Sequence, residues 1–322
     1  MRQALIGALV ASALLGGAQA ARAQDYPNRP ITVVIPWPPG SLLDGMVRLV
    51  GAEMQKRVGQ PTVIDFKPGA SGTIGAKFVV NSAKPDGYTL FFSSSLSHHP
   101  LLNKNNGVDS GKEMVAVSNF GTAPILFVVS SKLPVNSLPE LLAYAKSQTH
   151  GVKYGIAGAT TQLVAAMLKD KSGLVAADIP YKGLAPVVTA LLAGEVDVGS
   201  ASAQSFLTHI QAGSLRPLFV TSNRRYAILP NVQTATEAGA PYLAPLLPNY
   251  GMWAPPGTPK AIVDKLSRDL AAAIRAPGIA EQMLKNQGTE AIGSTPEESL
   301  RAFNTEVKAW EEAVRLAKYH PE

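Results

Sequence analysis

The alternation of short apolar runs with helical stretches is the feature that most constrains the fold. Runs typical of strands occupy 31–36, 61–66 and 88–95, and stretches compatible with helices, 42–58 and 72–82, lie between them. Turn signals such as Gln60-Pro61 end the helical stretches. Because strand–helix–strand units align neighbouring strands in parallel, this order predicts an α/β fold with a mostly parallel sheet covered by helices.

A second set of alternating elements begins near Pro124. It predicts strands at 124–130, 153–158, 177–183, 196–202 and 215–222, with helices at 138–148, 161–171, 186–193 and 203–212. From Thr258 onward the tail reads as helical, and Thr258 and Thr295, each followed by proline, are candidate N-caps. We therefore expect two α/β units, with a tail that carries no sheet of its own and packs on the first unit.

The first 23 residues have the order of a secretory signal. Arg2 precedes an apolar run at 4–15 and then small residues, and the run is too short to span a bilayer. Cleavage after Ala20 or Ala23 fits, and we favour Ala23. The sequence thus predicts an exported protein.

Composition excludes several classes of function. The chain has no cysteine, which excludes disulfides, thiolate metal sites, thiol nucleophiles and lipidation at an N-terminal cysteine. Without Arg2 and Arg22 the balance is 27 basic against 23 acidic residues, and no Lys/Arg run exceeds two. This charge is too weak and dispersed for nucleic acid but suits a small anion.

Six expected strand ends are rich in small and hydroxyl-bearing residues. In an open α/β sheet, ligands bind outside the carboxyl ends of the strands, where helix starts offer free N–H groups. Two units with such loops indicate a binding cleft between them. The segments are 36–41 (PWPPGS), 67–73 (KPGASGT), 93–97 (SSSLS), 157–162 (AGATTQ), 181–186 (YKGLAP) and 199–204 (GSASAQ).

The sequence gives little evidence for a catalytic or metal-binding site. The chain lacks GxSxG, HExxH and the phosphate loop GxxxxGK[ST], and GASGTIG (69–75) does not match GxGxxG. His98-His99 is the only histidine pair, and adjacent residues of a strand point to opposite faces. We expect neither a cofactor nor a metal, although serines of these loops could still assemble a hydrolase site in space.

Several residues of the loops allow two interpretations. Asp44 can cap a helix with Ser41 or contact a ligand. The apolar side chains of Trp37, Leu42 and Leu43 can belong to the core, or they can form an apolar wall against a ligand's carbon skeleton. Lys182 can be an ordinary solvated surface charge, or it can lie at the rim of the cleft.

Longer segments of the chain resemble a known family. YPNRPITVVIPWPPGSLLDGMVRLV, PGASGTIGAKFV, PDGYTLFFSSS, YGIAGATTQL, IPYKGLAPVVTALLAGEVD, LRPLFVTSNRR and APPGTPKAIVDKL occur in the order seen in the Bug family. These are periplasmic solute-binding proteins of tripartite tricarboxylate transporters, and the resemblance covers about Tyr26 to Trp310. It implies a type II periplasmic-binding-protein fold, two α/β lobes with a ligand cleft and two hinge crossings. It also implies a carboxylate ligand, bound largely through backbone amides and waters and delivered to a membrane permease.

The resemblance also carries candidate site residues onto this sequence. The first-lobe loop spans Pro38 to Asp44. Together with Trp37, this loop supplies the largest group of expected ligand contacts. The expected ligand contacts are Trp37, Pro39, Gly40, Ser41, Leu42, Leu43, Asp44, Ser93, Ser94, Ser95, Gly158, Ala159, Thr160, Thr161, Tyr181, Lys182, Gly183 and Ser200. Thr160 or Thr161 would donate at a helix start.

Departures from the family pattern bear on the ligand. The first loop carries Leu42-Leu43 where the family has smaller or polar residues, and the second-lobe loop lacks the family's Gly-Asn-Gly-Ser-like residues and following histidine. Ser200 lies where the family often has an aspartate. Loss of that acid argues against an amino acid, so we expect an aromatic or aliphatic mono- or dicarboxylate.

The hinge crossings are expected near 120–125 and 245–252. Lobe 1 would then comprise 24–122 plus 249–322, and lobe 2 would comprise 123–248. A monomeric transport receptor is the main hypothesis. A ligand-sensing domain for a membrane signalling partner and an exported serine hydrolase are the alternatives.

Overall fold

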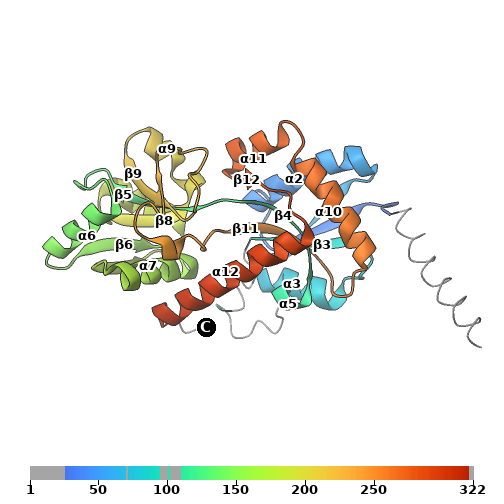
Figure 1. Ribbon diagram of the computed structural model, residues 1–322, viewed down its shortest axis with the longest axis horizontal. Helices are drawn as coiled ribbons and strands as arrows, with labels where there is room; N and C mark the ends of the chain where they lie inside the picture. Colours follow the sequence, from blue (N-terminus) through green and yellow to red (C-terminus); the bar gives the residue numbers. More distant parts are fainter. Residues whose placement is uncertain (1–25, 70–71, 95–100, 102–109, 319–322) are drawn as a thin grey trace, which may run out of the picture.

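The computed structural model describes residues 26–69, 72–94, 101 and 110–318, and forms two α/β units side by side (Figure 1). The expected signal segment, 1–23, lies outside the described residues. Each unit is built on its own six-stranded sheet.

The first sheet has the strand order β12-β4-β11-β3-β1-β2. Strands β1, β2 and β3 run parallel, whereas β11 runs antiparallel to both β3 and β4. The sequence did not predict β4, β11 or β12. Strand β12, from the tail, adds an edge strand to the first unit's sheet by pairing with β4. The bounds are β1 (Ile31–Ile35), β2 (Thr62–Phe66), β3 (Thr89–Ser93), β4 (Val115–Thr122), β11 (Asn249–Ala254) and β12 (Glu290–Ala291).

The second sheet has the order β10-β9-β5-β8-β6-β7. Strand β5 runs antiparallel to β8 and β9, whereas β6 runs parallel to β7 and β8. The five strands expected in this unit all form, and β10 is an addition. The bounds are β5 (Ile125–Ser130), β6 (Val152–Ile156), β7 (Ala176–Pro180), β8 (Val198–Ser202), β9 (Leu215–Val220) and β10 (Gln233–Thr234).

Helices cover both faces of each sheet, and four clusters of buried apolar residues fill the layers between them. The first unit carries α2 (Leu42–Val58), α3 (Thr73–Ser82), the one-turn α5 (Ser110–Glu113), α10 (Lys260–Ile274) and α11 (Ile279–Gln287). The second carries α6 (Leu138–Ser147), α7 (Ala159–Ser172), α8 (Leu184–Ala193) and α9 (Leu207–Gln211), with 3-10 turns η2 (Ala203–Ser205) and η3 (Pro241–Leu243). The helix expected over 203–212 is therefore split.

The helix starts follow from local side-chain chemistry. Thr295 caps α12 (Pro296–Ala317) through a capping box with Glu298, as expected. Thr258 does not cap α10, because its hydroxyl donates to the Pro255 carbonyl at 2.8 Å and the helix starts at Lys260.

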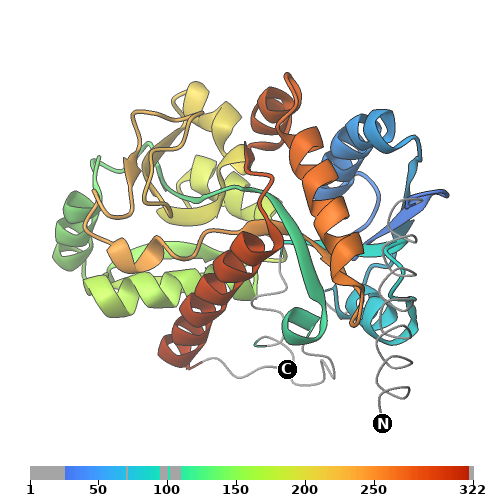
Figure 2. The same cartoon turned by 45° about the vertical axis from the view of Figure 1, so that its right-hand side comes forward.

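Helix α12 departs from the expectation that the tail packs on the first unit alone. Its first half lies against β4 and carries Phe303 into the first unit's core. Its second half runs beside α7 and buries Ala309, Trp310 and Ala313 in the core of the second unit. Figures 1 and 2 show α12 running from beside β4 of the first unit to beside α7 of the second.

The strand directions bring one edge of each sheet to face the other. The register makes β4 parallel to β1, β2 and β3, so the carboxyl ends of all four lie on one edge. In the second sheet β6, β7, β8 and β9 end on one edge, where β5 begins. Because only Ala123 and Pro124 separate β4 from β5, these two edges face each other. The return crossing lies alongside, where Ala123 N–H donates to the Pro248 carbonyl at 3.4 Å.

Candidate ligand-binding site

The predicted loops all follow strands that end on the facing edges. The first unit supplies the segment after β1 and the end of β3, and the second unit supplies the segments after β6 and β7. Helices α2, α7 and α8 start directly from three of these loops, so their first N–H groups and positive dipole ends lie at the edge. This arrangement suits an anion held between the units.

The loop before α2 is organised by Asp44. Its Oδ2 accepts from Gly40 N–H at 2.8 Å, and its backbone N–H donates to Ser41 Oγ at 3.4 Å. Arg48 Nε lies 2.6 Å from the other carboxylate oxygen. The structure thus shows the capping role of Asp44, and a ligand contact stays a prediction.

The apolar residues of this loop divide between core and surface. Leu43 is buried in the first unit's core, and Trp37 and Leu42 are half-buried against it. Pro39 and Gly40 are exposed at the edge. The core interpretation therefore accounts for the two leucines, while Pro39, Gly40 and Ser41 remain accessible.

Ser93 ends β3 and is buried, and Ser94 follows it half-buried, whereas Ser95 lies outside the described residues. Both described serines line a small pocket closed by α12. In its wall, Asn119 Nδ2 donates to Asn249 Oδ1 at 2.7 Å, and Asn249 Nδ2 donates to the buried Glu306 at 2.8 Å. This network joins α12 to the start of β11, beside the crossing, so Ser93 and Ser94 lie deep near the hinge.

The second-unit loop is a tight turn into α7. Gly158 has a φ of 150°, which glycine adopts without strain, and it precedes the first helical residue, Ala159. Thr161 Oγ1 accepts from Ala157 N–H and donates to the Gly158 carbonyl, both at 2.8 Å. Because that hydroxyl holds the turn, the backbone N–H groups and Thr160 are the donors left for a ligand.

The segment after β7 forms the adjoining start of α8. Gly183, at a φ of 99°, is its N-cap, and no side chain caps this helix. Tyr181 is half-buried against the second unit's core, and Lys182 is exposed. Lys182 is thus placed to add positive charge at this edge.

Ser200 is placed differently from the other predicted residues. It lies within β8, is 1% exposed, and accepts the Tyr154 hydroxyl at 2.7 Å. Burial raises the pKa of Tyr154, which keeps its hydroxyl protonated as the donor. This placement gives Ser200 a role inside the second unit, and its contact with a ligand stays a prediction.

The two units also touch through a segment that sequence reasoning missed. The buried Tyr226 hydroxyl donates to the Gly288 carbonyl at 2.6 Å, and Ala227 N–H donates to Glu290 Oε1 at 3.2 Å. Burial raises the pKa of Tyr226. No motif marks this contact, because its partners are 62 residues apart in the chain.

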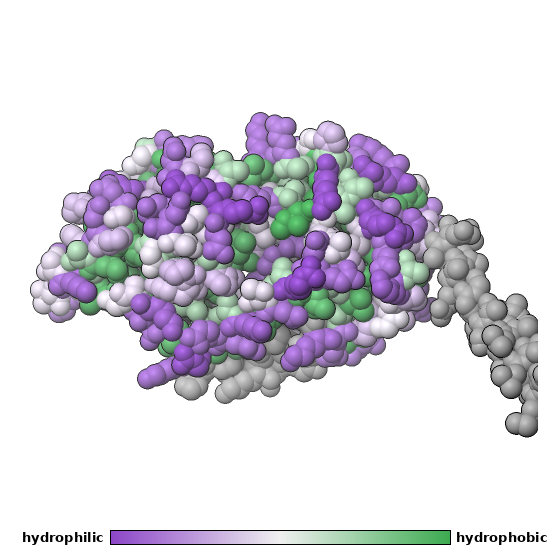
Figure 3. All heavy atoms as spheres, in the orientation of Figure 1, coloured by the Kyte–Doolittle hydropathy of each residue, from purple (hydrophilic) through white to green (hydrophobic). Residues whose placement is uncertain are grey.

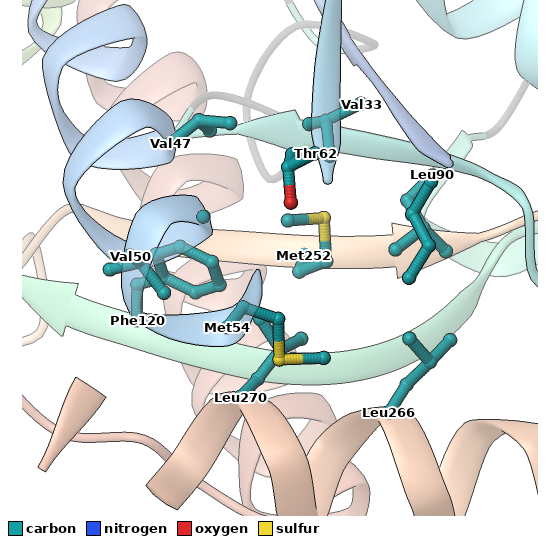
Figure 4. Close-up of a pocket in the computed structure, with 12 residues that line it drawn as sticks. Val33, Val47, Val50, Met54, Thr62, Leu90, Phe120, Met252, Leu266 and Leu270 are labelled. Carbon is teal, nitrogen blue, oxygen red and sulfur yellow. The ribbon is translucent and has the colours of Figure 1, made fainter. Parts of the chain in front are cut away.

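A small apolar pocket lies elsewhere, inside the first unit between the sheet and helices α2 and α10 (Figure 4). Valine, leucine, methionine and phenylalanine side chains point into it, and Thr62 brings the one oxygen labelled there. Such a lining offers a carboxylate no set of donors, so this pocket is a packing feature of the core.

Other site types find no support in the part of the chain that the structure describes. There, no three His, Asp or Glu side chains are grouped to hold a metal, and no helix has the length and apolarity to cross a membrane. His98 and His99 lie outside that part. On the face drawn in Figure 3, apolar residues form small separate patches among polar ones.

Comparison with known proteins identifies the family. Residues 46–317 match the family described as "Tripartite tricarboxylate transporter family receptor". The chain belongs to this receptor family. It is a family of solute receptors rather than enzymes, which argues against the serine hydrolase alternative.

Individual relatives agree with this assignment. The receptor is 33% identical to Protein BugT of Bordetella pertussis over 319 residues, 97% of this chain and 96% of BugT. The structure of periplasmic binding protein BugD is 31% identical with a TM-score of 0.72, over 92% of this chain and all of that one. The structure "R. palustris Rpa4515 with adipate" is 30% identical with a TM-score of 0.76, also over 92% of this chain and all of that one. The Bug resemblance and the two-lobed periplasmic-binding-protein fold expected from the sequence are thereby confirmed.

Proposed function

We propose that the protein is a periplasmic receptor that binds one small carboxylate between its two units and delivers it to the permease of a tripartite tricarboxylate transporter. The observation that carries this proposal is that three helices, α2, α7 and α8, start at two sheet edges joined by a two-residue connection. Backbone N–H groups there can satisfy a buried carboxylate without a buried cation.

Two observations favour a ligand class: the proposed site has no acidic side chain at position 200, and one relative is described with a dicarboxylate. Position 200 holds a serine rather than an acid that could bind an amino group, and Trp37 adds an aromatic side chain beside the first loop. The relative Rpa4515 is described with adipate, an aliphatic dicarboxylate. An aliphatic or aromatic mono- or dicarboxylate is therefore favoured over an amino acid.

The mechanism is closure of two lobes, 24–122 with 249–322 and 123–248, about the crossings at Ala123 and Pro248. A carboxylate first meets the loop before α2 and is then covered by the starts of α7 and α8. Closure removes water from the ligand's carboxylate, and each N–H group that then donates to it replaces a hydrogen bond lost with that water. The closed form presents both lobes to the permease, which distinguishes it from the open form.

Location and assembly complete the proposal. The segment 1–23 directs export and is removed, so the mature receptor acts in the periplasm as a monomer. It uses no cofactor or metal and has no nucleic-acid partner. The carboxylate and the transporter permease are its two partners.

The test is a thermal-shift screen of refolded, ligand-stripped protein against carboxylates and amino acids. A ligand at a thousand times its Kd adds about 4 kcal/mol to the free energy of unfolding, a clear rise in Tm. Hits among aliphatic or aromatic acids support the proposal. Hits only among amino acids, or none with folded protein, contradict it.

A pair of variants tests the site itself. Thr160→Trp places a bulky side chain at the start of α7, whereas Thr189→Trp makes the same change at an exposed position of α8. Binding should weaken at least tenfold in the first variant and stay unchanged in the second. Equal affinity in both would show that the ligand does not meet the α7 start.

A further inference from the structure

A polar pocket lies where the two units join. The first unit supplies Thr122 and Glu290 to its lining, the segment after β9 supplies Arg224, and the two crossings supply Pro124 and Leu247. Its volume of about 220 Å³ is far above the roughly 10–15 Å³ that one water needs. The pocket therefore has room for a small organic molecule that would contact both units.

The order of the strands separates this pocket from the loops of the carboxylate site. Strand β12, which carries Glu290, pairs with β4 on the side away from β3 and β1. Strand β9, which precedes the Arg224 segment, pairs with β5 on the side away from β6 and β7. The β4–β5 connection thus lies between the pocket and the starts of α2, α7 and α8, so a molecule in the pocket leaves the proposed site free.

Two charged side chains of the pocket come from opposite units and do not pair with each other. Among the described residues no carboxylate pairs with Arg224, whereas its neighbour Arg225 pairs with Glu237 at 3.1 Å. Glu290 accepts from Ala227 N–H at 3.2 Å through Oε1, and no described cation pairs with its carboxylate. The pocket thus presents one unpaired guanidinium and one unpaired carboxylate to an occupant.

The segment that carries Arg224 is braced by its own hydrogen bonds. Arg224 N–H donates to Ser222 Oγ, and Thr236 Oγ1 donates to Asn223 Oδ1, both at 3.0 Å. The buried Tyr226 fixes the end of the segment against the first unit. The guanidinium of Arg224 and the amide N–H groups of Asn223 therefore start from a fixed backbone, which suits recognition of a carboxylate.

A molecule with both a carboxylate and an ammonium satisfies both charges of the pocket. A guanidinium matches a carboxylate through two parallel N–H donors, and a carboxylate accepts a charge-assisted hydrogen bond from an ammonium. A simple anion would be repelled by Glu290, and a simple cation by Arg224. Pro124, Ala244 and Leu247 add apolar lining against which the methylene groups of such a molecule can pack.

We propose that this pocket is a second ligand site, which binds a small amino acid zwitterion with its carboxylate on Arg224 and its ammonium on Glu290. The bound molecule bridges the two units beside the crossings. The inference goes beyond the proposed function and does not depend on it, because neither residue belongs to the carboxylate site.

The test is calorimetric titration of the ligand-stripped protein with ω-amino acids from glycine to ε-aminohexanoate, a series that varies the distance between the two charges. At least one member should bind as one molecule per chain. The matched probes are the alkanoate and the alkylamine of the same chain length, each of which keeps one of the charges. Both should bind at least tenfold more weakly, a loss of about 1.4 kcal/mol or more.

Variants locate the bound molecule. Arg224→Leu and Glu290→Gln should each raise the Kd of the best-binding amino acid at least tenfold, because each removes one of the two charges. Glu290→Gln keeps a side-chain oxygen that can accept from Ala227 N–H. The controls Arg268→Leu and Glu281→Gln make the same changes at exposed positions outside the pocket and should leave the Kd unchanged.

The opposite results overturn the inference. No measurable binding of any member of the series overturns it, and so does binding that Arg224→Leu and Glu290→Gln leave unchanged, because the molecule then lies elsewhere. Equal affinity for an amino acid and its alkanoate shows that the ammonium is not recognised and overturns it as well. The proposed function is tested separately, by carboxylates that carry no ammonium, so either can fail alone.

Discussion

Trp310 tests whether the C-terminal helix is a structural part of the second unit. The side chain is 0% exposed within that unit's core, although α12 begins on the first unit. Its Nε1 also donates to Glu306 Oε1 at 3.2 Å. We predict that Trp310→Ala destabilises the second unit more than the first.

The magnitude follows from the burial. Replacing a fully buried Trp with Ala costs about 3–5 kcal/mol, from lost apolar transfer and the cavity left behind. A loss of 1 kcal/mol lowers the Tm of a domain of this size by about 2–4 °C. We therefore expect Tm to fall by about 6–20 °C.

The assay is hydrogen exchange by mass spectrometry combined with thermal unfolding. Trp310→Ala should raise exchange in β5 and β6, while the control Phe303→Ala, on the same helix but in the first unit's core, should raise it in β4 and β11. A change in stability below about 1 kcal/mol for Trp310→Ala, smaller than any core truncation of this kind, would refute the reasoning. Faster exchange confined to β1 and β3 would refute it as well.

Three further changes have defined outcomes. Ser200→Ala removes the acceptor of the Tyr154 hydroxyl and should lower the free energy of unfolding, measured in urea, by about 1–3 kcal/mol. The double variant Ser200→Ala/Tyr154→Phe should recover part of that loss, because it also removes the hydroxyl left without an acceptor. Tyr226→Phe leaves the buried Gly288 carbonyl without its donor and should cost a similar amount in the same assay. Arg315, with Lys171, lowers the pKa of Glu312 from its usual 4.5 to about 2, so its contribution to stability is present above pH 4.5 and is lost as the pH falls towards 2. Glu312→Gln should flatten the stability–pH curve in that window.

The α/β character and most strands of both units could be predicted because each rests on a local pattern. Apolar runs bounded by Pro and Gly marked β1, β2, β3 and all the strands from β5 to β9. Strand β4 was missed because VAVSNFGT mixes polar residues into a buried strand, where Ser118 and Asn119 bond the backbone and side chains of distant segments. Strand β11, which carries Asn249 and Gly251, was missed for the same reason.

Loop positions in the site could be predicted, but the use of each side chain could not. Small residues after β1, β6 and β7 indicated the loops, and the structure places all three at the facing edges. The hydroxyl of Thr161 and the carboxylate of Asp44 turned out to brace their own turns, which spacing alone leaves open.

The central claim is that one carboxylate is held between the two units by N–H donors. Isothermal titration of stripped protein with the best-binding dicarboxylate and with its dimethyl ester tests this directly, because the ester keeps the carbon skeleton and removes both charges. The account predicts one site per chain for the acid, with no measurable binding of the ester. Equal binding of acid and ester would contradict it, since apolar contact rather than carboxylate recognition would then supply the affinity.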